Sequence, residues 1–426
     1  MNVKVRPSVV HGDVYAPPSK SYTHRAMTIA ALGKKAEISY PLLSKDTMAT
    51  VRACEAFGAT IHTPEEKEDI LRIIGVDGHP KVPEDVINAA NSGTTLRFMA
   101  AVGSLVDGAV VLTSDDSLRK RPNGPLLKAL NDLGANAFSA KDDGAAPIVV
   151  KGKLKGGEAT ISGEISSQFI SALLLACPFA CEDTVITVKG KLKSKPYVEM
   201  TLDMLESAGA KIVTDFTKFE IPHNQKFDLG SYVIPGDFSS ASYLLAAGAI
   251  TNSKVVVRNL IPSKQGDVAI VSILQQMGAD VVWDQDVGVV TVDGADLKGI
   301  RIDVGAHPDL VPTLAVLGTC AEGVTEITNA AHLRYKETDR LRAMSTELRK
   351  MGAKVKELPD GLVIEKSRLH GARLHGYNDH RIVMALTVAG LVAEGETVID
   401  DAESVEVSYP DFFDDLFSMG ANIGVE

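Results

Sequence analysis

The chain has 426 residues, of which 45% are hydrophobic and 23% charged, and 44 lysines and arginines stand against 55 aspartates and glutamates. This composition indicates a globular protein that is too long for one hydrophobic core, and the formal net charge of -11 argues against a nucleic-acid-binding protein. No apolar run reaches the roughly 18 residues that a membrane helix needs, so we expect a cytoplasmic protein without a membrane partner.

Cysteine and histidine usage gives no sign of a bound group. Four cysteines in a chain of this size do not indicate a disulfide framework, and the ten histidines show no metal-ligand spacing. We therefore expect no metal and no cofactor. The first residues, Met1 to Pro7, lack the long apolar core of a signal peptide.

Valines alternate with polar residues between positions 2 and 15, which predicts a strand that either begins the first repeat or pairs with the end of the chain. Pro17 and Pro18 then prevent a helix before Ser19, and an apolar stretch follows. Lys20 and Arg25 add full charges to a helix N-terminus, where unpaired N–H groups already favour an anion. The segment therefore predicts a phosphate or carboxylate site.

The same layout, a polar corner that opens an apolar helix, recurs along the whole chain. The later corners lie at residues 91–97, 166–171, 236–241, 307–312 and 378–382. A second, more polar helix pattern follows each corner and ends in Gly-Ala, and these glycines are spaced by 68 to 76 residues, at Gly58, Gly134, Gly209, Gly278, Gly352 and Gly420. Self-similarity at a fixed period indicates repeats, and six repeats in this length predict two domains of three.

Polar groups of the second and third repeats are candidate ligand contacts. Three successive cations, Arg119 to Arg121, precede Pro122 at the same phase as the corners, although such a loop is usually a solvated surface. Ser166 to Gln168 stand directly before an apolar run, where a helix cap is the alternative. Ser194 precedes a further helix that a proline starts.

The fifth and sixth repeats contain carboxylates among cations. Asp309 follows Pro308 at a helix start, where it is either a cap or a functional carboxylate. Lys336 and Arg340 lie four residues apart, which predicts one helical face, with Glu337 between them in sequence. Exposed ion pairing is the alternative explanation.

Equivalent corners of a pseudo-symmetric domain lie on the same side, so two facing domains would gather their charged residues in one cleft. A cluster of cations in an acidic protein implies a ligand with several negative charges, and the cations are Lys20, Arg25, Arg121, Lys336, Arg340 and Arg381. Asp309 and Glu337 would then be suited to proton transfer. Closure of the domains on the first substrate would expel water and complete the second site.

Taken together and in this order, these motifs resemble the enolpyruvyl transferases that form 5-enolpyruvylshikimate 3-phosphate. The resemblance covers nearly the whole chain, and the motifs are Pro17 to Arg25, Asn91 to Arg97, Lys120 to Pro122, Ser166 to Gln168, Ser194 to Tyr197, Lys336 to Arg340 and Asp379 to Arg381. It implies a two-domain inside-out α/β barrel in which each domain has three βαβαββ repeats related by a pseudo-threefold axis. The implied domains are 16–231 and 1–15 with 232–426.

The resemblance also implies the reaction and its residues. The enolpyruvyl group of phosphoenolpyruvate would pass to the 5-hydroxyl of shikimate 3-phosphate, with release of phosphate, in a monomer. The implied catalytic residues are Lys20, Asp309 and Glu337. Shikimate 3-phosphate would be held by Lys20, Ser21, Arg25, Ser166, Ser167, Gln168, Ser194, Asp309 and Lys336. Phosphoenolpyruvate would be held by Lys20, Gly93, Arg121, Gln168, Arg340 and Arg381.

Two positions depart from the family pattern, and two other functions stay open. Val407 stands where a lysine is common, and His332 stands where some members have asparagine. The sister transferase that acts on UDP-N-acetylglucosamine typically has Lys-Asn at Lys20-Ser21, and it has a cysteine in the loop that here spans Ser114 to Arg121. A non-catalytic phosphosugar-binding protein on the same repeat would not need carboxylates among the cations.

Overall fold

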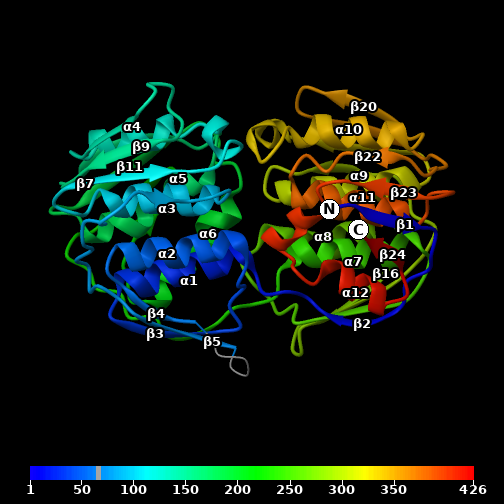
Figure 1. The fold of residues 1–426 in the computed structure, drawn as a ribbon, viewed down its shortest axis with the longest axis horizontal. Coiled ribbons are helices and arrows are strands. Elements are labelled where there is room, and N and C mark those ends of the chain that lie inside the picture. The colour runs from blue at the N-terminus through cyan, green and yellow to red at the C-terminus, as the bar shows by residue number, and fades with distance from the viewer. Residues whose placement is uncertain (64–68) are drawn as a thin grey trace. The chain divides into compact units, whose positions relative to one another are not determined.

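The computed structural model describes residues 1–63 and 69–426, and the chain divides into two compact units (Figure 1). The unit that we call the terminal unit consists of Met1–Pro17 and Pro235–Glu426, and the unit that we call the central unit consists of Pro18–Ile234. These boundaries lie at most three residues from those predicted from the sequence.

The described part of the chain contains six four-stranded sheets, three in each unit. The sheets of the central unit have the spatial orders β14 (Gly230–Val233), β3 (Lys35–Ser39), β5 (Ile70–Ile74), β4 (Thr60–His62); β6 (Ile87–Asn88), β7 (Ala109–Thr113), β9 (Ile148–Lys151), β8 (Asn136–Ser139); and β10 (Gly157–Ser162), β11 (Thr184–Lys189), β13 (Lys218–Ile221), β12 (Val213–Thr214). Those of the terminal unit are β2 (Gly12–Tyr15), β15 (Val255–Arg258), β17 (Val289–Asp293), β16 (Asp280–Asp284); β18 (Arg301–Asp303), β19 (Val324–Thr328), β21 (Gly361–Glu365), β20 (Lys354–Leu358); and β22 (Arg373–Leu374), β23 (Thr397–Ile399), β1 (Val3–Arg6), β24 (Asn422–Val425).

All six sheets share one pairing pattern. In each order above, the first two strands are parallel and the other neighbours are antiparallel. A parallel pair needs a crossover, and a helix provides it in four sheets, whereas the parallel pairs β14–β3 and β2–β15 join distant parts of the chain. The last two strands in each order form a hairpin-like antiparallel pair, except β1 and β24, which come from opposite ends of the chain. The predicted βαβαββ repeat is confirmed, and it occurs three times in each unit.

Strands from distant parts of the sequence complete three of the sheets. Residues 2 to 15 form two strands instead of the single predicted strand. β1 pairs with β24 at the other end of the chain, with Val3 opposite Val425, and β2 pairs with β15. In the central unit, β14 follows all the other strands in sequence but pairs with β3. Each unit is therefore closed by strands that the order of the sequence does not place there.

Each repeat has an inner and an outer helix. The inner helices are α1 (Lys20–Leu32), α3 (Gly93–Gly103) and α5 (Ser167–Ala176) in the central unit, and α7 (Phe238–Ile250), α9 (Val311–Cys320) and α11 (His380–Gly390) in the terminal unit. The outer helices are α2 (Lys45–Ala56), α4 (Gly124–Asp132), α6 (Lys195–Ser207), α8 (Ala269–Gln276), α10 (Arg340–Lys350) and α12 (Phe412–Ser418). Short 3-10 turns are η1 (Leu118–Lys120), η2 (Cys177–Phe179), η3 (Gly266–Val268), η4 (Pro308–Leu310), η5 (Ala331–Tyr335) and η6 (Ala402–Val407).

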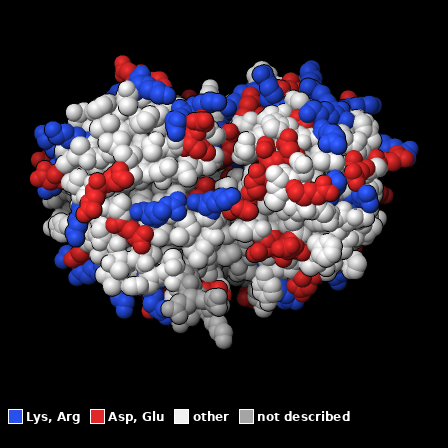
Figure 2. Space-filling view, viewed as in Figure 1, with Lys and Arg blue, Asp and Glu red and all other residues white. Residues whose placement is uncertain are grey.

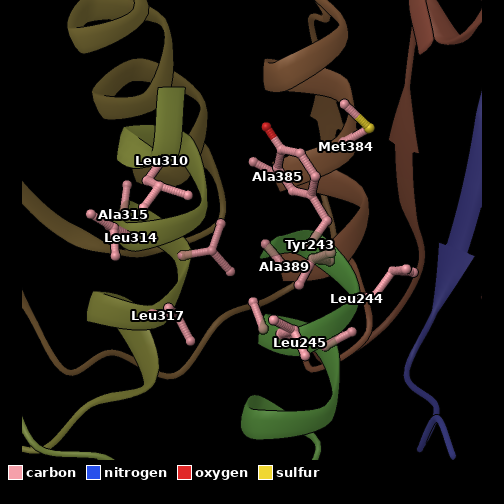
Figure 3. Close-up of a cluster of buried hydrophobic side chains, with 14 of the residues drawn as sticks. Tyr243, Leu244, Leu245, Leu310, Leu314, Ala315, Leu317, Met384, Ala385 and Ala389 are labelled. Atoms are coloured by element: carbon pink, nitrogen blue, oxygen red, sulfur yellow. The ribbon is translucent and has the colours of Figure 1, made fainter. Parts of the chain in front are cut away.

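The inner helices form the core of each unit, and the sheets lie outside them, which makes the barrel inside-out. All eleven residues of α11 and twelve of the thirteen residues of α7 are buried. A helix that is apolar all round is stable only when it is covered on every side. Figure 3 shows α7, α9 and α11 meeting through side chains such as Leu245, Leu314 and Ala385.

The ends of the helices follow local sequence signals. Each outer helix ends at one of the six periodic glycines, and all six have a positive φ, between 86° and 102°. Glycine adopts this left-handed conformation without the cost that a Cβ imposes, so it ends the helix. Ser44 makes a reciprocal capping box with Thr47 at the start of α2.

Charges at the surface are of both signs, and acidic and basic side chains are interspersed over the visible face (Figure 2). Among residues 1–63 and 69–426, no helix has both the length and the apolar character that crossing a bilayer requires.

Glycines let the inner helices approach the sheets closely. A Cβ built on Gly248 of α7 would lie 2.8 Å from Val292 and 2.9 Å from Val255, whereas one on Gly103 of α3 would lie 3.4 Å from Val110. Both distances at Gly248 are shorter than van der Waals contact allows. The distance at Gly103 is an ordinary contact.

We predict that Gly248→Ala lowers the free energy of unfolding by about 1 to 3 kcal/mol, because the core must shift to accept the methyl group. Gly103→Ala is the matched control and should be neutral or stabilising, since alanine favours helix over glycine by about 1 kcal/mol. Urea unfolding of both variants measures the difference. Equal effects would contradict the close approach at Gly248.

Candidate active site

Arg340 is the centre of a buried ion-pair cluster in the terminal unit. It is the first residue of α10, and its side chain is only 1% exposed. Its Nε and Nη2 atoms donate to Asp379 (2.8 and 3.1 Å), Nη1 donates to Asp309 (2.9 Å), and Nη2 also donates to Glu337 (2.6 Å). Burial alone would lower the pKa of Arg340, but the three carboxylates raise it above its ordinary value, so the guanidinium is charged.

Asp309 is the carboxylate that most cations share. Besides Arg340, it contacts Arg381 Nη2 at 3.2 Å and Lys336 Nζ at 3.5 Å. Burial acts to raise the pKa of Asp309, but the charges of Arg381, Lys336 and Arg340 outweigh it and hold the pKa well below the usual range. Asp309 is therefore ionised at neutral pH and can accept a hydrogen from an alcohol.

The structure thus brings together five residues that the sequence places in the site. Asp309 lies in η4, directly before α9, so it stands at a helix start as predicted, and its side chain makes no cap, which excludes the capping alternative. The local prediction for Lys336 is wrong. Lys336 does not share a helical face with Arg340, because its backbone is extended and α10 begins at Arg340. Both side chains reach Asp309 nonetheless, since Asp339 caps α10 and turns the chain there.

Two further carboxylates, to which the sequence motifs assign no role, belong to the cluster. Asp379 caps α11 by accepting a hydrogen bond from the Arg381 N–H (3.0 Å), and it pairs with Arg340. The local sequence signal for its place in the site was an N-cap aspartate near an arginine. Asp267 lies in η3, which packs against η4, and its carboxylate accepts a hydrogen bond from the Ser239 hydroxyl. No local pattern marks Asp267, because Ser239 lies 28 residues away and the nearby charges of Asp309 and Arg381 come from other repeats.

In the central unit, Arg25 of α1 is a buried cation of a different kind. Its side chain donates to Thr201 Oγ1 (2.8 Å), to Ser171 Oγ (3.4 Å), and to the carbonyl oxygens of Ser21 (2.9 Å) and Tyr197 (3.1 Å). Every acceptor that it contacts within the described residues is a neutral oxygen. Burial lowers the pKa of Arg25 to about 10, which still leaves it charged at neutral pH. A buried cation among neutral acceptors favours an anionic ligand nearby.

The N-terminus of α3 lies beside two more guanidinium groups. A Cβ built on Gly93 would meet Arg121 Nη1 at 3.4 Å and Arg97 Nη1 at 3.5 Å, so the absence of a side chain leaves room next to both. Arg121 is buried, in contrast to the solvated loop that composition alone favours, and its Nη2 donates to Asn91 Oδ1 (3.3 Å). The N-terminus of a helix and two cations together form a place for an anion.

The remaining predicted residues of the central unit lie at helix starts. Lys20 opens α1 and pairs with Asp46 (3.2 Å). Ser166 caps α5 through the N–H of Gln168 (3.3 Å), so the capping alternative holds for this serine. Ser167 is buried at the first position of α5, and Gln168 links α5 to α3 by accepting from Arg97 (2.5 Å) and donating to Thr94 (2.9 Å). Ser194 precedes α6 in the left-handed conformation.

Among the described residues, one group of side chains is of the type that can bind a metal ion. Ligand atoms of His375, Asp400 and Asp401 lie within 4.8 Å of one another. His375 Nδ1 already contacts both oxygens of Asp400 (2.8 and 2.9 Å), and the Gly376 N–H donates to the same carboxylate (2.7 Å). These bonds satisfy the group as a histidine–carboxylate pair. The cations and carboxylates around Arg340 are suited to anions and protons instead.

The fold and these two groups of buried charges define a two-domain α/β protein with sites for small anions, in which carboxylates stand among the cations. The family model for EPSP synthase (3-phosphoshikimate 1-carboxyvinyltransferase) matches residues 5–416. The chain belongs to this family.

Similar proteins agree over the full length. The chain is 60% identical to the 3-phosphoshikimate 1-carboxyvinyltransferase of Methanocella arvoryzae, covering 100% of both chains, and 49% identical to that of Methanocaldococcus jannaschii, covering 98% and 97%. A solved EPSP synthase of Acinetobacter baumannii superposes with a TM-score of 0.84 at 29% identity, covering 100% of this chain and 99% of the other.

We predict that Asp267→Asn becomes progressively more stable, relative to the unchanged protein, as the pH rises from 5 to 7. Burial, with the nearby charge of Asp309, raises the pKa of Asp267 to about 7. In this range Asp267 keeps its proton in the folded protein but has released it in the unfolded chain. The unchanged protein therefore loses up to about 1.4 kcal/mol of unfolding free energy per pH unit as the pH rises, and the asparagine variant does not. The gain should level off above pH 7.

Urea unfolding of both proteins at several pH values measures this difference. The asparagine keeps an oxygen that accepts from Ser239, so the comparison isolates the charge. A difference in stability that does not vary with pH would contradict the raised pKa.

Proposed function

We propose that this protein transfers the enolpyruvyl group of phosphoenolpyruvate to the 5-hydroxyl of shikimate 3-phosphate and releases phosphate, a step toward the aromatic amino acids. The observation that supports this most strongly is the Arg340 cluster, which places the carboxylates of Asp309 and Glu337 around one buried guanidinium, in a chain that matches this family from end to end. Lys20, Asp309 and Glu337 are the proposed catalytic residues.

In the proposed addition step, the 5-oxygen of shikimate 3-phosphate bonds to C2 of phosphoenolpyruvate. Asp309 accepts the hydroxyl proton, and Glu337 delivers a proton to the methylene carbon C3, which becomes a methyl group. The low pKa of Asp309 keeps it ionised and ready to accept. Lys336, 3.5 Å from Asp309, screens the charge of the tetrahedral intermediate.

In the proposed elimination step, the bond from C2 to the phosphate oxygen breaks, the leaving phosphate takes up the proton that Asp309 holds, and Glu337 takes a proton back from the methyl group. The double bond forms again, so the product carries the enolpyruvyl group. Glu337 must therefore gain and lose a proton in one cycle. Arg340 supports this, because an anionic substrate that binds its guanidinium competes with the 2.6 Å contact to Glu337 and so favours protonation of that carboxylate.

The central unit is proposed to hold most of the substrate charge. Arg25, with only neutral acceptors around it, is suited to an anionic group of shikimate 3-phosphate, together with Ser21, Ser166, Ser167, Gln168 and Ser194. Arg121 and Gly93 are suited to phosphoenolpyruvate at the α3 N-terminus, together with Gln168, Arg340 and Arg381. Lys20 is proposed to contact both substrates.

The single cleft between the two units, the closing motion, the monomeric state and the cytoplasmic location stay predictions. The same holds for the absence of a cofactor and of nucleic-acid or membrane partners.

Phosphate release from phosphoenolpyruvate tests the proposed function directly. We expect release that depends on shikimate 3-phosphate and none with UDP-N-acetylglucosamine, because Lys20-Ser21 and the loop without cysteine differ from the pattern of the sister transferase. Release with the second acceptor only would assign the chain to that transferase. Binding of phosphosugars without any release would favour the non-catalytic alternative.

We predict that Glu337→Gln binds shikimate 3-phosphate normally but lowers kcat by about 10²- to 10⁴-fold, because an amide cannot exchange the proton at C3. Calorimetry measures binding, and phosphate release measures turnover. Glu326→Gln is the control in the same unit, since Glu326 pairs with the exposed Arg301 at 3.6 Å and such surface pairs matter little. Full activity of Glu337→Gln would exclude this carboxylate from proton transfer.

A further inference from the structure

Lys336 and Glu337 lie on a short segment without regular structure, which makes their placement a question of its own. The segment, residues 336–339, connects η5 to α10, and both side chains reach the Arg340 cluster from it. A catalytic group must be held close to its productive geometry, and irregular segments do this less well than helices or strands. Something outside the segment must therefore fix it.

Arg334 connects this segment to strand β20 and to the turn that follows β20. It lies in η5, just before the segment, and its guanidinium donates in four directions. Nη1 donates to Glu357 Oε1 of β20 (2.9 Å) and to Asp339 Oδ2 (2.7 Å), and Nε and Nη2 donate to the carbonyl oxygens of Pro359 (2.9 Å) and Leu358 (2.7 Å). The planar fork of arginine suits this set of acceptors, which a lysine cannot match.

Asp339 gives the contact its effect on the site. One of its oxygens caps α10 by accepting from the Arg342 N–H (3.1 Å), while the other accepts from Arg334. The next residue is Arg340, which holds Asp309, Glu337 and Asp379. Arg334 therefore fixes both ends of the segment: the N-terminal end through its own position in η5, and the C-terminal end through Asp339, which caps α10.

We propose that Arg334 is a positioning residue for the transferase reaction, which holds Lys336 and Glu337 in place by tying Asp339 and the β20–β21 turn together. It contacts none of the groups proposed to touch substrate except through Asp339. The inference rests on the proposed function for its kinetic consequence, but the contact itself has a structural consequence that is measured without substrate.

Loss of the four bonds should release the segment and misplace Glu337. A displacement of about 1 Å costs on the order of a hundredfold in rate, while most of the proposed substrate contacts lie outside the segment. For Arg334→Met we therefore expect kcat to fall by about a hundredfold, with KM for both substrates changed by less than about threefold. Arg334→Lys, which keeps the charge but loses the fork, should fall between this variant and the unchanged protein.

Hydrogen exchange of the peptide that contains residues 336–339 is the second measurement. It should speed up in Arg334→Met and less in Arg334→Lys. Arg349→Met is the matched control, because Arg349 also ties α10 to the same hairpin, with Nε donating to the Val355 carbonyl (2.8 Å), but at the far end of the helix. It should leave both kcat and exchange of the segment unchanged.

The outcomes separate the two proposals. If Arg334→Met lowers thermal stability as Arg349→Met does, with kcat per folded molecule and exchange of the segment unchanged, Arg334 is only structural and the inference fails. If the unchanged protein releases no phosphate with shikimate 3-phosphate, the proposed function fails, and the exchange measurement alone decides whether Arg334 fixes the segment.

Discussion

The buried guanidinium of Arg340 is the constraint on which the terminal unit depends. A charge out of contact with water is tolerated only when it is fully paired, and each of the three carboxylates around Arg340 comes from a different place in the chain. Asp309 belongs to the fifth repeat near its first helix, Glu337 to the segment before α10, and Asp379 to the sixth repeat. The charge is paired only when the fifth and sixth repeats are packed together, so the chemistry and the fold require each other.

The two units use the same repeat for different chemistry. In the terminal unit the cations Lys336, Arg340 and Arg381 are shared with carboxylates, which suits proton transfer beside a charged substrate. In the central unit Arg25 faces neutral oxygens, so its charge is available to an anion. A side chain caps the inner helix in four of the six repeats, and the other side chains at the helix starts decide what each unit does. A shared fold does not fix function, which lies in the residues placed on it.

Support for the proposed catalytic groups extends beyond the residues that touch substrate. Asp339 and Arg334 hold the start of α10, Asp379 holds the start of α11, and Asp267 with Ser239 lies beneath η4. These residues orient the proposed catalytic groups, and none of them is proposed to contact substrate. Networks of this kind are strong when every member is paired, because the low dielectric of the interior strengthens each bond.

The sequence by itself determined the repeat, the starts of most helices and the glycines that end the outer ones, because caps, prolines and left-handed glycines act within a few residues of where they stand. It also placed Asp309, Lys336, Glu337, Arg340 and Arg381 in one site. Only the tertiary structure decided that β1, β2 and β14 complete sheets far from their neighbours in sequence, that Lys336 lies outside α10, and that Asp379 and Asp267 join the cluster. These features depend on strand pairing and burial between distant residues, and among them only Asp379, an N-cap aspartate beside an arginine, had a local signal.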